Sequence, residues 1–151
     1  GAAPGGWSQY ARERVGAKGR VIAVDILAMD PIADVLFIQG DFTDVATEKA
    51  CLEQVKKQGA DLVISDMAPN LTGIRDTDQA KSMGLAELVY DFCQNALKPG
   101  GHLLIKLFEG AGTQEYRQLL KEHFAQIVTR KPKASRDHSR EFYVLARSYG
   151  L

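Results

Sequence analysis

The segment Leu62-Val63-Ile64-Ser65-Asp66-Met67-Ala68-Pro69-Asn70 decides the fold class. An apolar run ends in a polar pair and then meets a proline, which is typical of a strand that is buried on both faces and leads into a loop. Runs of the same kind occur at 21–26, 35–38 and 102–108. Each is short and bounded by turn residues, so we predict four strands of a parallel sheet.

Helical segments separate these strands. We expect helices at 7–15, from Thr43 or Thr47 to about 57, at 85–97, and from a Thr113 cap onward. Residues 71–81 are expected to form a polar loop. Strands that alternate with helices imply a parallel α/β sheet with helices on both faces. The runs at 127–128 and 142–145 flank a basic loop that has no room for a helix, so they predict an antiparallel hairpin. We expect one domain over residues 1–151.

The composition excludes several classes of protein. The 151 residues are 45% hydrophobic and 25% charged, as in an ordinary globular domain. Nineteen basic and nineteen acidic residues give zero net charge, which excludes nucleic-acid binding through global charge but leaves room for a local basic patch. No apolar run is long enough to span a bilayer, and no signal peptide is visible. The two cysteines have neither zinc-ligand nor disulfide spacing, so we expect a metal-free, cytoplasmic protein. No sequence feature indicates an oligomer, so we also expect a monomer.

The chain opens with the glycine turn Gly1-Ala2-Ala3-Pro4-Gly5-Gly6. Such a turn normally follows a strand, so we expect the first strand to lie upstream and the domain to be truncated at its N-terminus. Asp25 comes about twenty residues later at a strand end, where a carboxylate binds ribose hydroxyls. Turn and carboxylate together favour an adenosine-containing cofactor, although the G-x-G-x-x-G pattern typical of NAD sites is absent. Taken alone, Asp25 could be a helix cap. Asp41, at the next strand end, could accept from an adenine amine, and a cap of the following helix fits its spacing equally well.

Two further charged residues end apolar strands. Asp66 follows the run at 62–65, and Lys106 lies near the end of the run at 102–108. Charged groups at the rim of a dry sheet are costly unless they are paired or used in chemistry. Neighbouring strands would bring the two side chains together, either as a structural ion pair or as part of a site.

Five segments, taken together and in order, carry a family resemblance. They are Gly1-Ala2-Ala3-Pro4-Gly5-Gly6-Trp7-Ser8-Gln9, Gln39-Gly40-Asp41-Phe42, Ser65-Asp66-Met67-Ala68-Pro69-Asn70, Lys106-Leu107-Phe108 and Ser139-Arg140-Glu141. The sequence resembles the FtsJ/RrmJ family of ribosomal RNA large-subunit methyltransferases over essentially its whole length. That resemblance implies a Rossmann-like S-adenosylmethionine-dependent methyltransferase fold. It also implies a mostly parallel seven-stranded sheet with one antiparallel strand near its C-terminal edge.

The resemblance also implies a function and a set of residues. The expected reaction is 2′-O-methylation of a uridine ribose in 23S ribosomal RNA, on the large ribosomal subunit, with S-adenosylmethionine as cofactor. The implied catalytic residues are Asp66, Lys106 and Glu141, and a further catalytic lysine of the family would lie upstream of Gly1. Cofactor contacts are implied for Gly5, Trp7, Asp25, Asp41, Phe42 and Asp66. Glu141 could instead pair with Arg140.

The C-terminal region is locally basic. Lys131, Lys133, Arg136 and Arg140 are candidate RNA-binding residues, and Arg75 and Lys81 in the expected polar loop would add contacts. A solvated loop in a neutral protein is the other interpretation of this basic segment.

Rival functions remain open at this point. The same catalytic set would serve a 2′-O-methyltransferase of transfer RNA or of a messenger cap. A base amino-methyltransferase is disfavoured because the segment at 65–70 lacks the Asn/Asp-Pro-Pro-aromatic pattern. A noncatalytic ribosome-assembly factor is disfavoured by Asp66, Lys106 and Glu141, and a dehydrogenase by the glycine turn.

Overall fold

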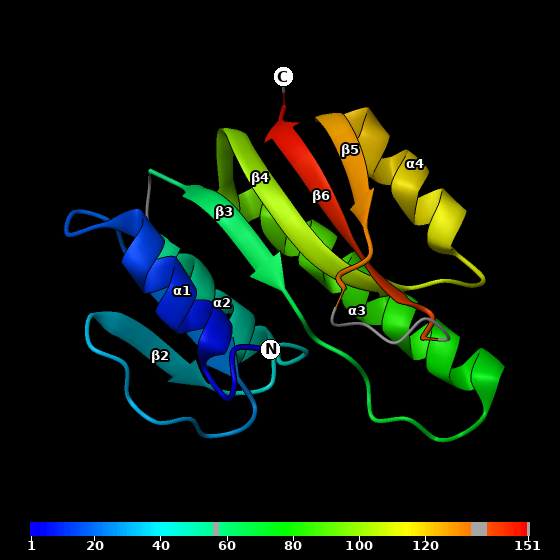
Figure 1. Ribbon diagram of the computed structural model, residues 1–151, viewed down its shortest axis with the longest axis horizontal. Helices are drawn as coiled ribbons and strands as arrows, with labels where there is room; N and C mark the ends of the chain where they lie inside the picture. The colour runs from blue at the N-terminus through cyan, green and yellow to red at the C-terminus, as the bar shows by residue number, and fades with distance from the viewer. Residues whose placement is uncertain (56–57, 134–138, 151) are drawn as a thin grey trace. The chain divides into compact units, whose positions relative to one another are not determined.

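The computed structural model describes residues 1–55, 58–133 and 139–150 (Figure 1). The chain divides into two compact units, Gly1–Lys56 and Lys57–Leu151, which are described separately below. The organisation of 1–151 as one domain stays a prediction.

The first unit contains two helices and a pair of parallel strands. Its elements are α1 (Gly6–Val15), β1 (Val21–Asp25), β2 (Val35–Gln39) and α2 (Val45–Val55). In the parallel pair Val21 lies opposite Val35, and Asp25 lies opposite Gln39. The predicted first helix and first two strands are therefore confirmed. Gly16 ends α1 with φ 72°, a conformation that glycine adopts without steric cost.

The second unit contains a four-stranded sheet and two helices. Its elements are β3 (Ala60–Ser65), α3 (Arg75–Ala96), β4 (Leu97–Phe108), α4 (Thr113–His123), β5 (Phe124–Arg130) and β6 (Glu141–Tyr149). The strand order is β3-β4-β6-β5. β3 and β4 are parallel, whereas β6 runs antiparallel to both β4 and β5. The predicted hairpin and the antiparallel strand near the C-terminal edge are confirmed. The described residues form six strands, and the seven-strand count stays a prediction.

The core of this unit lies on one face of the sheet. Leu103, Ile105 and Leu107 of β4 are almost fully buried, and they pack with β6 and with the apolar sides of α3 and α4. The alternate residues of β4, including Lys106, are only partly buried. Buried and partly buried residues therefore alternate along β4, and Lys106 lies on its partly buried face.

Several element boundaries also differ from expectation. α3 begins at Arg75, so the expected loop at 71–81 ends early and both Arg75 and Lys81 lie in the helix. The first turns of α3 bury the polar residues Asp78 and Gln79, which a hydrophobic pattern cannot reveal. Gly112, not Thr113, is the N-cap of α4. Neither expected threonine caps α2, because the Asp44 carbonyl accepts the first helical N–H bonds, from Thr47 and Glu48. β4 starts at Leu97 rather than at residue 102.

Candidate active site at the strand ends

The glycine turn lies against the carboxyl end of β1. The Ala2 N–H donates to the Val24 carbonyl over 3.0 Å, and the Ala3 N–H donates to Asp25 Oδ2 over 2.9 Å. Gly5 is the N-cap of α1: its φ is 124°, and its carbonyl accepts the Gln9 N–H. The structure therefore brings the glycine turn and Asp25 together, as their spacing predicts.

Asp25 uses both carboxylate oxygens within its own unit. Oδ2 accepts the Ala3 N–H, and Oδ1 accepts the Leu27 N–H at 2.9 Å. The side chain is 11% exposed, and the Asp25 carbonyl accepts the Gly40 N–H from the end of β2. Asp25 thus fixes the glycine turn and the loop after β1. Because each carboxylate oxygen has two lone pairs, acceptor capacity remains for a ligand hydroxyl.

Asp41 stabilises the turn that precedes α2. Its Oδ1 accepts the Thr43 hydroxyl at 2.7 Å and the Thr43 N–H at 2.9 Å. These two bonds lower the pKa of Asp41 below its ordinary value, with the hydroxyl bond contributing most. Both bonds go to Thr43, which precedes α2, so they stabilise the turn and do not cap the helix, as the alternative had it. Phe42 beside it is partly buried, and Trp7 in the first turn of α1 is partly exposed.

The start of α1 fits a polar cofactor. Gly5, the N-cap of this helix, makes no side-chain capping bond. A Cβ added at Gly6 would meet no other part of the described chain within 4 Å, so space lies open beside the backbone there. The positive end of the helix dipole favours an anionic or oxygen-rich group at this position.

The second unit holds the most chemically distinctive cluster. Lys106 Nζ lies 3.3 Å from Asp66 Oδ1, and the Tyr143 hydroxyl donates to the same oxygen over 2.6 Å. The Lys106 and Asp66 side chains are 13% and 27% exposed. The predicted proximity of Asp66 and Lys106 is confirmed. β4 and β6 pair Lys106 with Tyr143, which is why the three side chains meet.

Tyr143 is a neutral hydrogen-bond donor in this cluster. Burial, followed by the hydrogen bond and the negative charge of Asp66, raises the pKa of Tyr143 well above its ordinary value. The phenol therefore stays protonated at neutral pH and cannot act as a base. Tyr143 was not among the predicted site residues. Period-2 alternation from Glu141 could have placed Tyr143 on the same face of the strand.

Glu141 is the first residue of β6 and lies opposite Phe108. Alternation puts it on the same sheet face as Tyr143 and Lys106. Both backbone polar groups of Glu141 are hydrogen-bonded. The N–H donates to Ser139 Oγ at 3.2 Å, and the carbonyl accepts a bond from Lys131 Nζ at 2.6 Å. Arg140 Nη1 donates to the Glu109 carbonyl at 3.2 Å.

Two consecutive residues of α3 hold the loops that follow β3 and β4. Asp78 accepts the N–H and hydroxyl of Thr72, both at 2.8 Å, and the N–H of Gly73 at 3.1 Å. The backbone bond to Thr72 is the largest of the effects that lower the pKa of Asp78. Gln79 Nε2 donates to the carbonyls of Phe108 and Ala111. Neither Asp78 nor Gln79 was among the predicted site residues.

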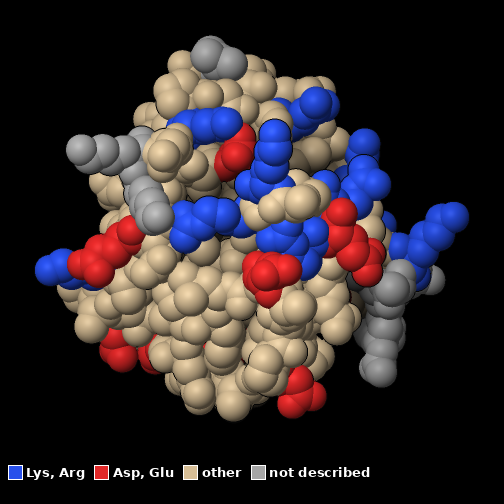
Figure 2. Space-filling model, turned by 90° about the vertical axis from the view of Figure 1, so that its left-hand side faces the viewer, with Lys and Arg blue, Asp and Glu red and all other residues tan. Residues whose placement is uncertain are grey.

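The structure describes three of the four candidate RNA-binding residues, and they have different surroundings. Lys131 Nζ donates to the Ser139 and Glu141 carbonyls, so this side chain also closes the hairpin. Lys133 is exposed, and Arg136 lies outside the described residues. Figure 2 shows acidic side chains among the basic ones on the face drawn there, in keeping with the zero net charge.

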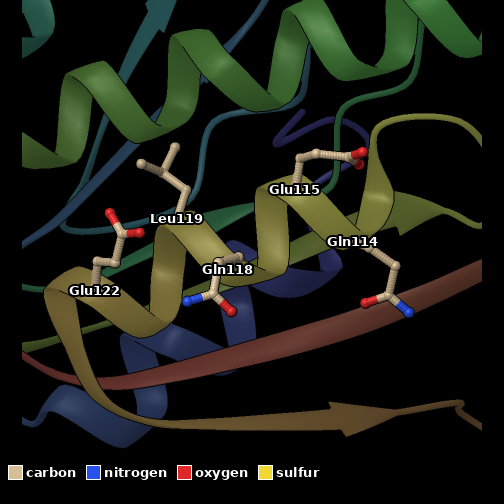
Figure 3. Close-up of a pocket in the computed structure, with 5 residues that line it drawn as sticks. All are labelled: Gln114, Glu115, Gln118, Leu119 and Glu122. Atoms are coloured by element: carbon tan, nitrogen blue, oxygen red, sulfur yellow. The ribbon is translucent and has the colours of Figure 1, made fainter.

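A separate depression of about 440 Å³ lies on the outer side of α4 (Figure 3). Its lining is Gln114, Glu115, Gln118, Leu119 and Glu122. Two carboxylates make it unsuited to phosphate groups. Within the described ranges no three His, Cys, Asp or Glu side chains gather as a metal site. No helix among these residues is both long and apolar enough to cross a membrane.

The fold is that of an α/β protein. Its candidate catalytic site is the cluster of Asp66, Lys106 and Tyr143 near the carboxyl ends of the parallel strands β3 and β4. The model of the FtsJ-like methyltransferase family matches residues 1–149. The chain therefore belongs to the FtsJ-like methyltransferase family.

Individual relatives agree with this assignment. The chain is 52% identical over 151 residues to the ribosomal RNA large subunit methyltransferase E of Alkalilimnicola ehrlichii, covering 100% of this chain and 72% of that protein. A putative ribosomal RNA methyltransferase from Plasmodium falciparum superposes with a TM-score of 0.87 at 28% identity, covering 99% and 84% of the two chains. Human methyltransferase-like protein 13, solved in complex with SAH, shares the fold with a TM-score of 0.63 at 13% identity, covering 97% and 68%.

Proposed function

We propose that this protein transfers a methyl group from S-adenosylmethionine to the 2′-hydroxyl of a uridine in 23S ribosomal RNA, on the large ribosomal subunit. Family membership and the names of its relatives support the reaction class and the RNA. The observation that carries the proposal is the Asp66–Lys106–Tyr143 cluster, because it holds an amine at the end of a parallel strand.

The first unit would hold the cofactor. Gly5 and Trp7 would contact it from the start of α1, Asp25 would accept from its ribose, and Asp41 with Phe42 would contact its adenine end. Asp66 would lie near its methionine part. When bound, S-adenosylmethionine supplies an electrophilic methyl group. The open space beside Gly6 and the remaining acceptor capacity of Asp25 support this assignment.

The residues of the second unit would activate the hydroxyl. A 2′-hydroxyl is a weak nucleophile, so transfer needs an aligned oxygen and a group that takes its proton. Asp66 Oδ1 contacts both Lys106 Nζ and the Tyr143 phenol, which fixes the direction of the amine. Lys106 would contact the 2′-hydroxyl, with Glu141 on the same face of the sheet.

Two roles for Lys106 are distinguishable. As a base, a neutral amine takes the hydroxyl proton; as an ammonium, it orients the hydroxyl and favours the negative charge that develops on oxygen. Lys106→Arg separates them, because arginine keeps the charge and does not deprotonate in proteins. Substantial activity in this variant supports the ammonium role, and activity as low as that of Lys106→Ala supports the base.

The basic C-terminal segment would contact RNA phosphates. We propose Lys131, Lys133, Arg136 and Arg140 for this role, since lysine and arginine side chains that neutralise phosphates release the counterions condensed on the RNA. The KM for ribosomal subunits should then rise with salt, and Lys133→Ala should flatten that dependence. A salt dependence equal to that of the unmodified protein would argue against a phosphate contact by Lys133.

We also propose that the protein acts as a cytoplasmic monomer without a metal, and that the complete fold has a seven-stranded sheet. Light scattering would measure the molar mass in solution and so test whether the protein is a monomer. Addition of a chelator should leave activity unchanged if the protein needs no metal.

The decisive test of function is transfer of labelled methyl to large ribosomal subunits that lack the modification, followed by mapping of the modified nucleotide. We expect a single 2′-O-methyluridine. Label only in transfer RNA or in a messenger cap would keep the chemistry and replace the substrate. Cofactor binding without any label would favour the ribosome-assembly factor.

A further inference from the structure

Gln79 is a buried amide that joins two elements of the second unit. Its side chain comes from α3, and the residue is 4% exposed. Nε2 donates to the Phe108 carbonyl over 3.0 Å and to the Ala111 carbonyl over 3.1 Å. Oε1 is buried and has no hydrogen-bond partner among the residues that the structure describes. A buried acceptor left in this way is costly, so core packing alone would favour an apolar side chain here.

The loop after β4 is shaped to receive this amide. Gly110 has φ 156°, and a Cβ at this position would lie 2.8 Å from Gln79 Cδ. The amide therefore packs directly against the Gly110 backbone. Thr113 Oγ1 adds two bonds at 3.1 Å, donating to the Phe108 carbonyl and accepting the Gly110 N–H. The loop is thus held from α3 and from the start of α4.

This loop connects to both sides of the proposed catalytic cluster. Phe108 follows Lys106 by two residues on the same strand face, and Lys106 Nζ lies 6.0 Å from the centre of its ring. Glu109 donates its N–H to the Arg140 carbonyl at 2.9 Å, directly before Glu141. A shift of the loop would therefore displace the end of β4 and the start of β6 together.

We propose that Gln79 is a positioning residue for methyl transfer, which sets the geometry of Lys106 and Glu141 by holding the loop at 108–111. This inference rests on the proposed function, because Lys106 and Glu141 touch the substrate only in that reaction. Gln79 itself contacts backbone carbonyls and acts through the loop.

The test compares two Gln→Met substitutions on α3 in the full-length protein, since glutamine and methionine side chains are similar in length. Gln79→Met keeps the size of the side chain and removes both donors. Gln94→Met is the control, because Gln94 is exposed and its amide donates to a side chain of its own helix, the Tyr90 hydroxyl at 3.1 Å. We expect Gln79→Met to lower kcat about tenfold with KM for ribosomal subunits and the Kd for S-adenosylmethionine within about twofold. We expect Gln94→Met to match the unmodified protein.

Gly110→Ala displaces the loop independently, since its Cβ would overlap the Gln79 amide. We expect the same fall in kcat with unchanged cofactor affinity. Circular dichroism identifies which variants are folded. Unchanged kcat in either folded variant would overturn the proposal, as would an equal loss in Gln79→Met and Gln94→Met.

Lys106→Ala, assayed in parallel, separates this inference from the proposed function. If Lys106→Ala stays active, the proposed catalytic centre is wrong. If it is inactive and folded Gln79→Met turns over normally, only the positioning role of Gln79 is wrong.

Discussion

The strands β1 and β3, one in each unit, both lead to an aspartate at their carboxyl ends, and the two carboxylates have different partners. Asp25 at the end of β1 binds two backbone N–H groups, from Ala3 and Leu27. Asp66 after β3 binds two side chains, Lys106 and Tyr143. The first carboxylate shapes a turn against which a ligand can lie, and the second orients an amine. Aspartates that follow parallel strands in the two units thus differ in what they hold, backbone N–H groups at Asp25 and side chains at Asp66.

The largest expected effect is at the amine. Lys106→Ala should lower kcat at least a hundredfold, because it removes the group that would contact the 2′-hydroxyl. S-adenosylmethionine affinity, measured by calorimetry, should stay within a few-fold. Lys98→Ala is the control, since Lys98 is on the same strand, is exposed, and pairs with Asp61. Near-normal turnover in Lys106→Ala would contradict the division between the two aspartates.

Replacing Asp66, the carboxylate that orients the Lys106 amine, should affect both kcat and the affinity for S-adenosylmethionine. Asp66→Ala removes the partner of Lys106 and Tyr143 and the expected neighbour of the cofactor's methionine part. We expect kcat to fall at least tenfold and cofactor affinity to weaken severalfold, as measured by initial rates and calorimetry. Asp61→Ala, at an exposed carboxylate near the start of β3, should change neither. A variant with reduced affinity and full kcat would make Asp66 a binding residue only.

Asp25 should show the opposite balance. Asp25→Ala removes two hydrogen bonds to a carboxylate and should lower the free energy of unfolding by about 1 to 3 kcal/mol. It should also weaken cofactor binding, because the glycine turn loses its anchor, whereas kcat at saturating cofactor should stay closer to normal. Urea unfolding and cofactor titration measure both effects, with the exposed Asp30→Ala as control. An equal loss of kcat and affinity would erase the contrast with Asp66.

The smallest effect concerns alkaline stability. Burial is the largest cause that raises the pKa of Tyr116, and its hydroxyl donates to the Ala86 carbonyl at 2.8 Å. The native state therefore holds this proton more tightly than the unfolded chain, whose tyrosines titrate near pH 10. The protonated Tyr116 phenol therefore contributes fully to the free energy of unfolding below about pH 10. This contribution falls as pH rises further, by at most about 1.4 kcal/mol per pH unit. Tyr116→Phe should show a shallower loss of unfolding free energy between pH 9 and 11. Parallel curves would contradict this.

Hydrophobic patterning predicted most of the fold. The apolar runs ending near Asp25, Gln39 and Asp66 appear as strands, and the basic segment joins an antiparallel pair. Because β3 and β4 were correctly predicted as parallel neighbours, the sequence also predicted correctly that Asp66 and Lys106 lie close together. The family resemblance supplied the cofactor and the RNA.

The parts that patterning missed are polar and buried. Asp78 and Gln79 lie in the first turns of α3, where an apolar stripe is absent, so the helix was predicted to start too late. Tyr143 entered the site through the β4–β6 register, which a single sequence does not reveal. In both cases tertiary partners, rather than local propensity, decide the role of the residue.

The most direct test of the central claim is the position of the transferred methyl group. Full-length protein and its Lys106→Ala variant should be incubated with labelled S-adenosylmethionine and undermodified large ribosomal subunits, and the 23S RNA digested to nucleosides. We predict label in one 2′-O-methyluridine with the unmodified protein and none with the variant. Label on a base, or equal 2′-O-methylation by both proteins, would contradict the assignment of methyl transfer to the Asp66–Lys106 pair.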